Sequence, residues 1–345
     1  MSAPAPPTGI VLLNMGGPDT LSAVRPFLAN LFSDRELIRL PAPFLTQPLF
    51  ACLVSGIRAR KVKRYYEEIG GGSPIARHTE DQRAALEAAL AETGGNYRVY
   101  VGMRYWHPLA RHAALDMKQD GVARAVALSL YPQYCRATTG SSLADLAHWL
   151  RWAGAKIPLT EVSSYPDHPG YIAALVEKIR TTLDAAGAGR DAHLLFSFHG
   201  VPKHLIDEGD PYREESRRTV AAVMASFPGN PHSISYQSKV GRVEWLSPDT
   251  VDEVRRLGRE GVKTLVVIPA AFVSEHIETL HELDIRLKAT AEEAGIRTFL
   301  RVPALNDSPT FIRALRDLVL SALREPFAGK ADIGSPDLSR ERRPG

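Results

Sequence analysis

The segment Glu260-Gly-Val-Lys-Thr-Leu-Val-Val-Ile-Pro-Ala-Ala-Phe272 has the pattern of a helix end, a glycine cap and a short buried strand. The earlier segment Asp120-Gly-Val-Ala-Arg-Ala-Val-Ala-Leu-Ser-Leu-Tyr-Pro132 has the same pattern. Further apolar, β-rich runs alternate with helical patterns along the chain, which is typical of βαβ units and a parallel sheet. The predicted strands are Gly9–Leu13, Val99–Val101, Arg124–Leu130, His193–Ser197, Ser233–Tyr236 and Thr264–Pro269.

This repetition predicts two similar α/β units, residues 1–155 and 156–305. The pattern fits either an internal duplication or two independent αβ junctions, because such junctions recur without shared ancestry. A last helix at 309–323 is expected to pack back on the first unit. The polar tail at 329–345 is predicted to be disordered.

The composition limits the classes of function. The chain has 345 residues, 44% of them hydrophobic, which is enough for two cores. The net charge is only +3 and no basic stripe is interleaved with aromatic residues, so we expect no nucleic-acid partner. The first eight residues lack the features of a signal peptide, which favours a cytoplasmic protein.

Residues Leu37–Ile57 form an apolar stretch that contains three prolines and is therefore a poor transmembrane helix. Five basic residues lie between Arg58 and Arg64 directly after it. The stretch is either a helix that covers a domain and has a solvated basic end, or a surface that rests on an anionic membrane.

Residues able to carry chemistry follow the predicted strands. In open α/β sheets the ligand crevice lies at the carboxyl ends of the strands. Met15, Arg104, Tyr131 and His199 all stand shortly after a strand. A histidine in this position is either a hydrogen-bonded structural residue, a base near neutral pH or a ligand for a divalent metal ion.

An acidic segment, Ser274–Asp284, follows the strand at Thr264–Pro269. On a regular helix Glu275, Glu278 and Glu282 would share one face. That face is either a solvated surface or, because it begins near a strand end, part of the crevice.

The glycine-rich run Ile69-Gly-Gly-Gly-Ser-Pro74 is either an anion-binding loop or a sharp turn before a helix. No P-loop or dinucleotide fingerprint is present in the sequence. The residues alone therefore indicate metal or proton chemistry in an α/β crevice, without naming a substrate.

Several motifs, in order from about Thr8 to Leu323, resemble those of the ferrochelatase family. They are Leu13-Asn-Met-Gly-Gly-Pro18, Gly70-Gly-Gly-Ser-Pro-Ile75, Tyr131-Pro-Gln-Tyr134, Thr138-Thr-Gly-Ser-Ser142, Phe196-Ser-Phe-His-Gly-Val-Pro202, Gly209-Asp-Pro-Tyr212, Tyr236-Gln-Ser-Lys-Val-Gly241, Trp245-Leu246 and His276-Ile-Glu-Thr-Leu-His-Glu-Leu-Asp284. The resemblance implies two Rossmann-like domains with a porphyrin between them. It also implies insertion of Fe²⁺ into protoporphyrin IX, with both as substrates.

The resemblance assigns roles to particular residues. His199 and Glu278 match the catalytic pair, which also handles the metal, and Glu282, with Glu275, would extend a path for protons or metal. Residues expected to line the porphyrin pocket are Met15, Tyr66, Arg104, Tyr131 and Trp245. The segment 37–66 matches the lip over that pocket, through which peripheral membrane contact would occur. The sequence indicates no oligomeric state.

The family pattern also differs from this chain at one point. Some relatives hold a [2Fe–2S] cluster on four cysteines, whereas this chain has only Cys52 and Cys135, and Arg136 stands at the first cluster position. We therefore expect no cluster and no other cofactor. The stretch around Gln237 and Trp245 resembles the protoporphyrin-using branch more than the coproporphyrin-using branch. A chelatase for another metal or tetrapyrrole and a non-catalytic haem or metal carrier remain as alternatives.

Overall fold

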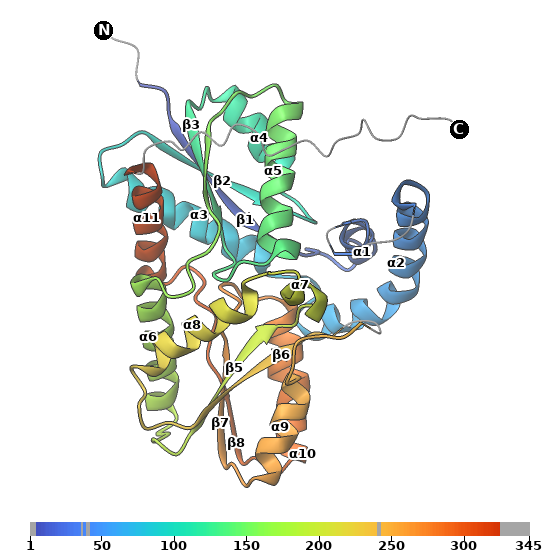
Figure 1. Cartoon of the computed structure of the whole chain (residues 1–345), viewed down its shortest axis with the longest axis vertical. Coiled ribbons are helices and arrows are strands. Elements are labelled where there is room, and N and C mark those ends of the chain that lie inside the picture. The colour runs from blue at the N-terminus through green and yellow to red at the C-terminus, as the bar shows by residue number, and fades with distance from the viewer. Residues whose placement is uncertain (1–4, 36, 39–41, 240–242, 325–345) are drawn as a thin grey trace.

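The computed structural model describes residues 5–35, 37–38, 42–239 and 243–324, and within them it contains two parallel sheets with the same strand order (Figure 1). The order in the first sheet is β2-β1-β3-β4 and in the second β6-β5-β7-β8. The strands are β1 (Thr8–Asn14), β2 (Tyr97–Met103), β3 (Arg124–Ser129), β4 (Leu159–Val162), β5 (His193–His199), β6 (His232–Gln237), β7 (Thr264–Pro269) and β8 (Thr298–Arg301). The prediction of a two-sheet α/β fold is confirmed.

Helices cover both faces of each sheet. The α-helices are α1 (Val24–Phe32), α2 (Pro43–Glu68), α3 (Ile75–Ala91), α4 (Ala110–Gln119), α5 (Ser141–Trp152), α6 (Pro169–Ala185), α7 (Lys203–Asp207), α8 (Tyr212–Met224), α9 (Thr250–Arg259), α10 (Lys288–Glu293) and α11 (Pro309–Arg324). Two segments are π-helical, η1 (Arg136–Gly140) and η2 (Glu278–Leu287).

The central strand β1 shows why these sequences form buried parallel strands. Ile10, Val11, Leu12 and Leu13 are all fully buried, because successive side chains point to opposite faces and both faces are covered. Val11 and Leu13 pack in one hydrophobic cluster with α4 and α5, whereas Ile10 and Leu12 belong to a second cluster. This second cluster also contains residues of α3, α6 and α8, so it runs through both units.

The two repeated segments end their helices in the same way. Gly121 and Gly261 both have a positive φ, 65° and 84°. The next residue in each case, Val122 or Val262, donates its N–H to the carbonyl five residues earlier, as in a Schellman motif. The glycine caps predicted from the sequence are therefore present before β3 and β7.

Two of the four edge strands, β4 and β8, were absent from the prediction. Each has four residues, all partly or fully accessible at the sheet edge, and each mixes apolar with polar side chains. β4 pairs with β3, so the first sheet continues past residue 155, where the sequence predicts the first unit to end.

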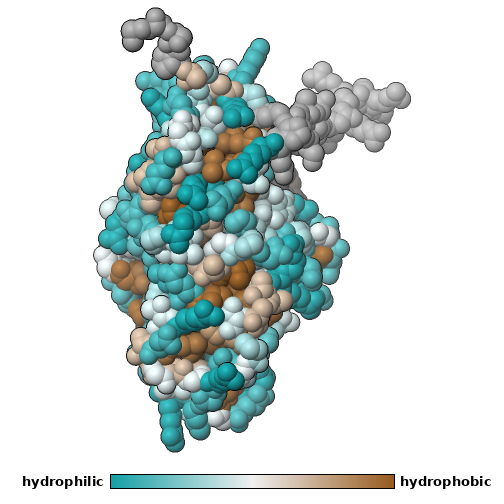
Figure 2. Space-filling model, turned by 90° about the vertical axis from the view of Figure 1, so that its left-hand side faces the viewer, coloured by the Kyte–Doolittle hydropathy of each residue, from teal (hydrophilic) through white to brown (hydrophobic). Residues whose placement is uncertain are grey.

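The helix predicted at 309–323 is α11, which packs on α3 and β4 of the first unit and on α6 of the second. Figure 1 shows it at the side of the molecule opposite α2, joining the two units. On the face viewed in Figure 2, hydrophobic side chains form separate patches among hydrophilic ones. The predicted tail at 329–345 lies outside the described residues.

Candidate active site

The carboxyl ends of β5 and β7 bring His199 and Glu278 together. His199 is the last residue of β5, and Glu278 is the first residue of η2, which follows β7 after a short loop. Because β5 and β7 are adjacent parallel strands, their ends lie side by side, and His199 Nδ1 is 2.7 Å from Glu278 Oε2. The His199 side chain is 35% exposed and that of Glu278 13%, so the imidazole remains accessible at the surface of the site.

The two groups shift each other's protonation. Burial alone would lower the pKa of His199, but the charge and hydrogen bond of Glu278 raise it above its usual value. Burial likewise opposes ionisation of Glu278, but His199 outweighs it and lowers the pKa of this carboxyl to about 2. Glu278 is thus an ionised acceptor at neutral pH, and Nδ1 of His199 donates to it, so that Nε2 is the ring nitrogen outside this contact.

A second carboxylate lies beside this pair on η2. A π-helix has i→i+5 hydrogen bonds and therefore more residues per turn than an α-helix, which brings positions i and i+4 close to one line. Glu278 and Glu282 stand at this spacing, and the Oγ atom of Ser238 lies within hydrogen-bonding distance of both carboxylates, at 3.1 and 2.5 Å. Burial and the nearby Glu278 raise the pKa of Glu282.

Glu275 does not share this face, and the prediction of one acidic helix face from Glu275 to Glu282 is wrong. The helix begins at Glu278, and Glu275 precedes it. Its Oε1 lies 2.5 Å from Nη1 of Arg301 and accepts from the N–H of Ala304, while Oε2 accepts from Thr279. Burial would raise the pKa of Glu275, but Arg301 and these donors lower it, so this carboxylate is an ionised partner within the fold.

His276 adds a third group that the sequence analysis did not single out. It is buried, its Nδ1 is 3.0 Å from the carbonyl oxygen of Ser274, and its Nε2 lies 3.9 Å from Glu278 Oε1. Burial lowers the pKa of His276. The ring of Phe272 lies between the two histidines, 6.2 Å from His199 and 4.7 Å from His276 between centroids.

Two of the predicted pocket residues, Tyr66 and Tyr131, interact with the charge of Glu278. Met15, Tyr66 and Ile277, the residue before Glu278, belong to one apolar cluster with α1 and α2. Burial first, and Glu278 second, raise the pKa of both Tyr66 and Tyr131, so both phenols are neutral donors. Trp245 pairs through its backbone with Pro202 in the loop that follows His199.

Arg104 is held by carboxylates of its own unit. Its guanidinium contacts Asp34 at 3.0 Å and Asp145 at 3.7 Å, and its Nε donates to Ser141. Asp34, which the sequence analysis did not identify, also accepts from the hydroxyls of Tyr105 and Ser141, each at 2.6 Å. The predicted strand-end arginine is thus the centre of a hydrogen-bonded network.

The glycine loop at 70–72 is a helix cap. Gly70 and Gly71 have φ of 104° and 95°, and their N–H groups donate to the carbonyls of Glu67 and Tyr66 at the end of α2. Because these N–H groups close the helix, the sharp-turn interpretation of this run describes the structure, and the anion-loop interpretation does not.

The helix α2 exposes a row of apolar side chains at a spacing of four residues. Leu45, Leu49, Leu53 and Ile57 are 80, 72, 62 and 70% exposed. This spacing places them along one side of the helix. No helix among the described residues is long and apolar enough to cross a membrane.

One further observation concerns metal ligands. Within the described ranges, no group of three or more His, Cys, Asp or Glu side chains is arranged to hold a metal ion.

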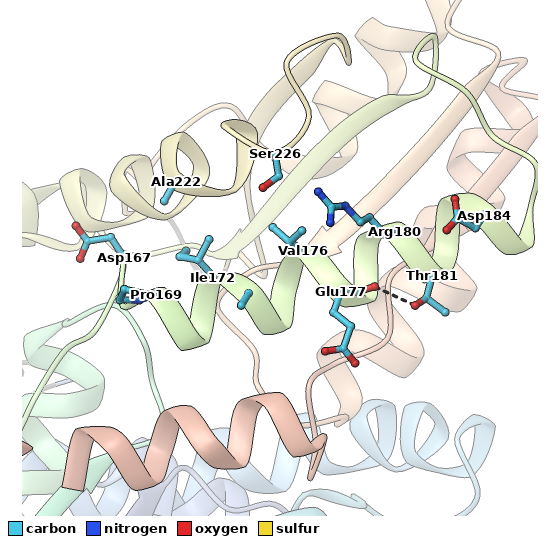
Figure 3. Close-up of a pocket in the computed structure, with 11 residues that line it drawn as sticks. Asp167, Pro169, Ile172, Val176, Glu177, Arg180, Thr181, Asp184, Ala222 and Ser226 are labelled. Atoms are coloured by element: carbon cyan, nitrogen blue, oxygen red, sulfur yellow. Dashed lines mark hydrogen bonds between the residues drawn. The ribbon is translucent and has the colours of Figure 1, made fainter. Parts of the chain in front are cut away.

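A groove of ≈ 700 Å³ lies between α6 and α8, and Figure 3 shows its lining. It contains Ile172, Val176 and Arg180 but none of the predicted site residues.

Known proteins similar to this chain agree with its fold and show its family. A family model described as ferrochelatase matches residues 7–323. Curated ferrochelatases from Picosynechococcus sp. and Cyanothece sp. are each 50% identical over 324 residues, which is 92% of this chain and 83% of each relative.

Solved structures share the architecture. SirB from Bacillus subtilis with Fe³⁺ has a TM-score of 0.54 at 8% identity and covers 92% of this chain and 95% of its own. CbiX, described as the terminal enzyme for siroheme biosynthesis in denitrifying bacteria, has a TM-score of 0.50 at 14% identity, covering 92% and 99%. At such identities the likeness concerns the fold alone, whereas the family match and the 50% identical relatives carry the assignment: the chain belongs to the ferrochelatase family.

Proposed function

We propose that this protein inserts Fe²⁺ into protoporphyrin IX, forming protohaem and releasing two protons, as the last step of haem synthesis. The observation that carries the proposal is the contact between His199 Nδ1 and Glu278 Oε2 at the carboxyl ends of β5 and β7. The family membership gives the reaction class, metal insertion, and the paired base and carboxylate supply the groups that this reaction requires.

The chemistry explains why two such groups are needed. A free-base porphyrin carries two pyrrole N–H protons, and both must leave as the Fe–N bonds form. His199, with Nε2 available, accepts protons or passes on the metal, and Glu278 takes the other role. Glu282 and, less directly, Glu275 would continue the path for protons or metal away from the ring.

Binding would distort the macrocycle so that its nitrogens face the incoming ion. Apolar and aromatic walls from Met15, Tyr66, Tyr131 and Trp245 would hold the ring off-planar, so that binding energy strains the substrate toward the transition state. In this proposal a propionate approaches the exposed edge of Arg104, whose side chain is 23% exposed, while Asp34 holds the guanidinium in place.

Contact with a membrane surface is a further part of this proposal. The exposed leucines of α2 precede a basic segment of the same helix, Arg58–Arg64, an arrangement that suits the interface of an anionic bilayer. We propose that the protein needs no cofactor and that Fe²⁺ is one of its substrates.

The test is an anaerobic assay with Fe²⁺ that follows the loss of porphyrin fluorescence, with protoporphyrin IX and coproporphyrin III in parallel. We expect catalytic turnover with protoporphyrin preferred, and loss of turnover in His199→Ala with its folding intact. A preference for coproporphyrin would support the metal-insertion reaction but would reject the assignment to the protoporphyrin-using branch of the family. Absence of turnover with either would reject the reaction and favour a carrier or another chelatase, and near-normal turnover of His199→Ala would reject the assigned base.

A further inference from the structure

Ser238 has an unusual backbone conformation next to the active-site carboxylates. It follows directly on β6 and has φ of 67°, in the left-handed region. Non-glycine residues enter this region at a cost in free energy that glycine avoids, and such strain tends to be kept where it serves a site. A serine at this position therefore needs a reason beyond the turn itself.

Its hydroxyl supplies that reason, because it contacts both carboxylates of η2. Ser238 Oγ lies 3.1 Å from Glu278 Oε2 and 2.5 Å from Glu282 Oε2. Each carboxylate also has one donor of its own. His199 bonds Glu278, and the side-chain amide of Gln237 donates to Glu282 at 3.3 Å. Ser238 is the hydrogen-bonding group that the two acids share.

Gln237 orients this arrangement from the interior. Its Oε1 accepts from the hydroxyl of Ser197 at 2.7 Å, which turns the amide nitrogen toward η2. There Nε2 also donates to the carbonyl oxygen of Glu278 at 3.1 Å. The end of β6 is thus fixed to the first turn of η2, and the left-handed turn at Ser238 aims its hydroxyl between the two carboxylates.

We propose that Ser238 is a positioning residue whose hydroxyl holds Glu278 and Glu282 side by side next to His199, and that the rate of metal insertion depends on it. Two neighbouring carboxylates repel each other, and a hydroxyl has a single proton to offer. The hydroxyl donates to one acid at a time, so it can pass from Glu278 to Glu282 when Glu278 turns toward the substrate. The inference rests on the proposed function and assigns a residue within the same site.

The backbone conformation provides a sharp test, because the effects on folding and on rate point in opposite directions. Ser238→Gly removes the hydroxyl and relieves the positive φ, so its melting temperature should stay equal or rise while kcat falls about 10- to 100-fold. Ser238→Thr keeps a hydroxyl but places a β-branched residue at positive φ, so its melting temperature should fall while most of kcat is retained. Ser238→Ala should resemble the glycine variant in kcat.

The measurements are kcat and KM for porphyrin and for Fe²⁺, with melting temperatures of the same preparations. We expect KM for porphyrin to stay unchanged. Thr181→Ala is the matched control, because its exposed hydroxyl bonds the carbonyl of Glu177 on α6 and lines the groove of Figure 3, which contains none of the proposed site residues. The proposal is overturned if Ser238→Gly keeps its kcat and Ser238→Thr loses it, because kcat would then change in the same direction as the melting temperature.

A crystal structure of Ser238→Gly separates this proposal from the proposed function. Even if the wild-type protein showed no turnover, the proposal requires Glu278 to leave its 2.7 Å contact with His199 in that variant. An unchanged contact, with Glu282 also in place, would reject the positioning role.

Discussion

The two units place different chemistry on the same backbone frame. Both sheets have the strand order 2-1-3-4 when each is numbered from its own first strand. At the carboxyl ends of the first sheet, Arg104 is enclosed by Asp34, Asp145 and Ser141. At the carboxyl ends of the second, His199 and Glu278 pair with each other and leave an imidazole nitrogen available.

This difference indicates that the shared fold sets the positions and that the residue types at the strand ends set the chemistry. In the first unit the charges at the strand ends satisfy one another and hold the fold together. In the second unit the His199 side chain remains 35% exposed. Substitutions in the two clusters should therefore separate stability from catalysis.

The largest effect is expected in the second unit. Glu278→Gln should lower kcat by about 10²- to 10⁴-fold, because it removes an ionised acceptor next to His199 while keeping the side-chain shape. The measurement is initial rate of metal insertion together with melting temperature. Glu253→Gln is the matched control, a buried carboxylate on α9 that pairs with Arg256 away from the site. Equal losses of rate in Glu278→Gln and Glu253→Gln would show that the loss does not depend on the contact with His199.

The converse result is expected in the first unit. Asp34→Asn should destabilise the protein by about 2–3 kcal/mol, because Arg104 and two hydroxyls lose a buried, charged acceptor. Urea unfolding measures this change. The kcat of the folded enzyme should stay close to that of the wild type, whereas KM for porphyrin should rise, because Asp34 no longer holds Arg104 in place for the propionate. Asp19→Asn, at an exposed carboxylate bonded to Trp106, should change stability by less than about 0.5 kcal/mol. A strong loss of kcat in the folded Asp34→Asn variant would instead mean that Asp34 takes part in the reaction itself.

The third prediction concerns α2, which lies between β1 and β2 and is much longer than α7 and α8, the helices between β5 and β6. Replacing Leu49 and Leu53 together by Glu should weaken binding to anionic vesicles about 10-fold or more, with stability unchanged, since both side chains are already exposed. Vesicle co-sedimentation measures the binding. Glu92→Gln, at the exposed end of α3, is the control for a surface change elsewhere. Unchanged binding of the double variant would exclude this surface.

The smallest effect is a pH dependence of stability. The raised pKa of His199 adds stability below its unfolded value of ~6.5, which is lost as pH rises through the folded pKa. The lowered pKa of Glu278 adds stability above its unfolded value of ~4.3, which is lost as pH falls toward about 2. The stability difference between wild type and Glu278→Gln should therefore be greatest between about pH 4.5 and 6.5. Urea midpoints across pH 3 to 9 would show it, and a difference that grows steadily with pH would contradict the pairing.

The sequence predicts what depends on local pattern. Fully buried strands such as Ile10–Leu13 are continuous apolar runs, and their order along the chain identified two α/β units. The edge strands Leu159–Val162 and Thr298–Arg301 were not predicted, because their half-exposed residues do not form a continuous apolar run. His199 and Glu278 were identified because they follow strands and match family motifs.

What the sequence could not predict depends on geometry at longer range. A helical pattern with 3.6 residues per turn placed Glu275 with Glu278, but the π-helix begins later and Arg301, from β8, binds Glu275. Asp34 had no motif of its own, and only the fold brings it to Arg104. Ser238 stood in a recognised motif, yet its role depends on a positive φ that no pattern of residue types reveals.

The position of α11 has a consequence for how the chain is made. Phe311, Leu315 and Val319 are fully buried, and they complete the hydrophobic cluster that contains Ile10 and Leu12 of the first strand. Nearly the whole chain must be synthesised before these side chains emerge. At about 5–20 residues per second, α11 follows the first sheet by on the order of ten seconds or more, and until then α3 covers this face of the sheet without α11. The N-terminal unit therefore cannot complete its hydrophobic core until the last helix has been synthesised.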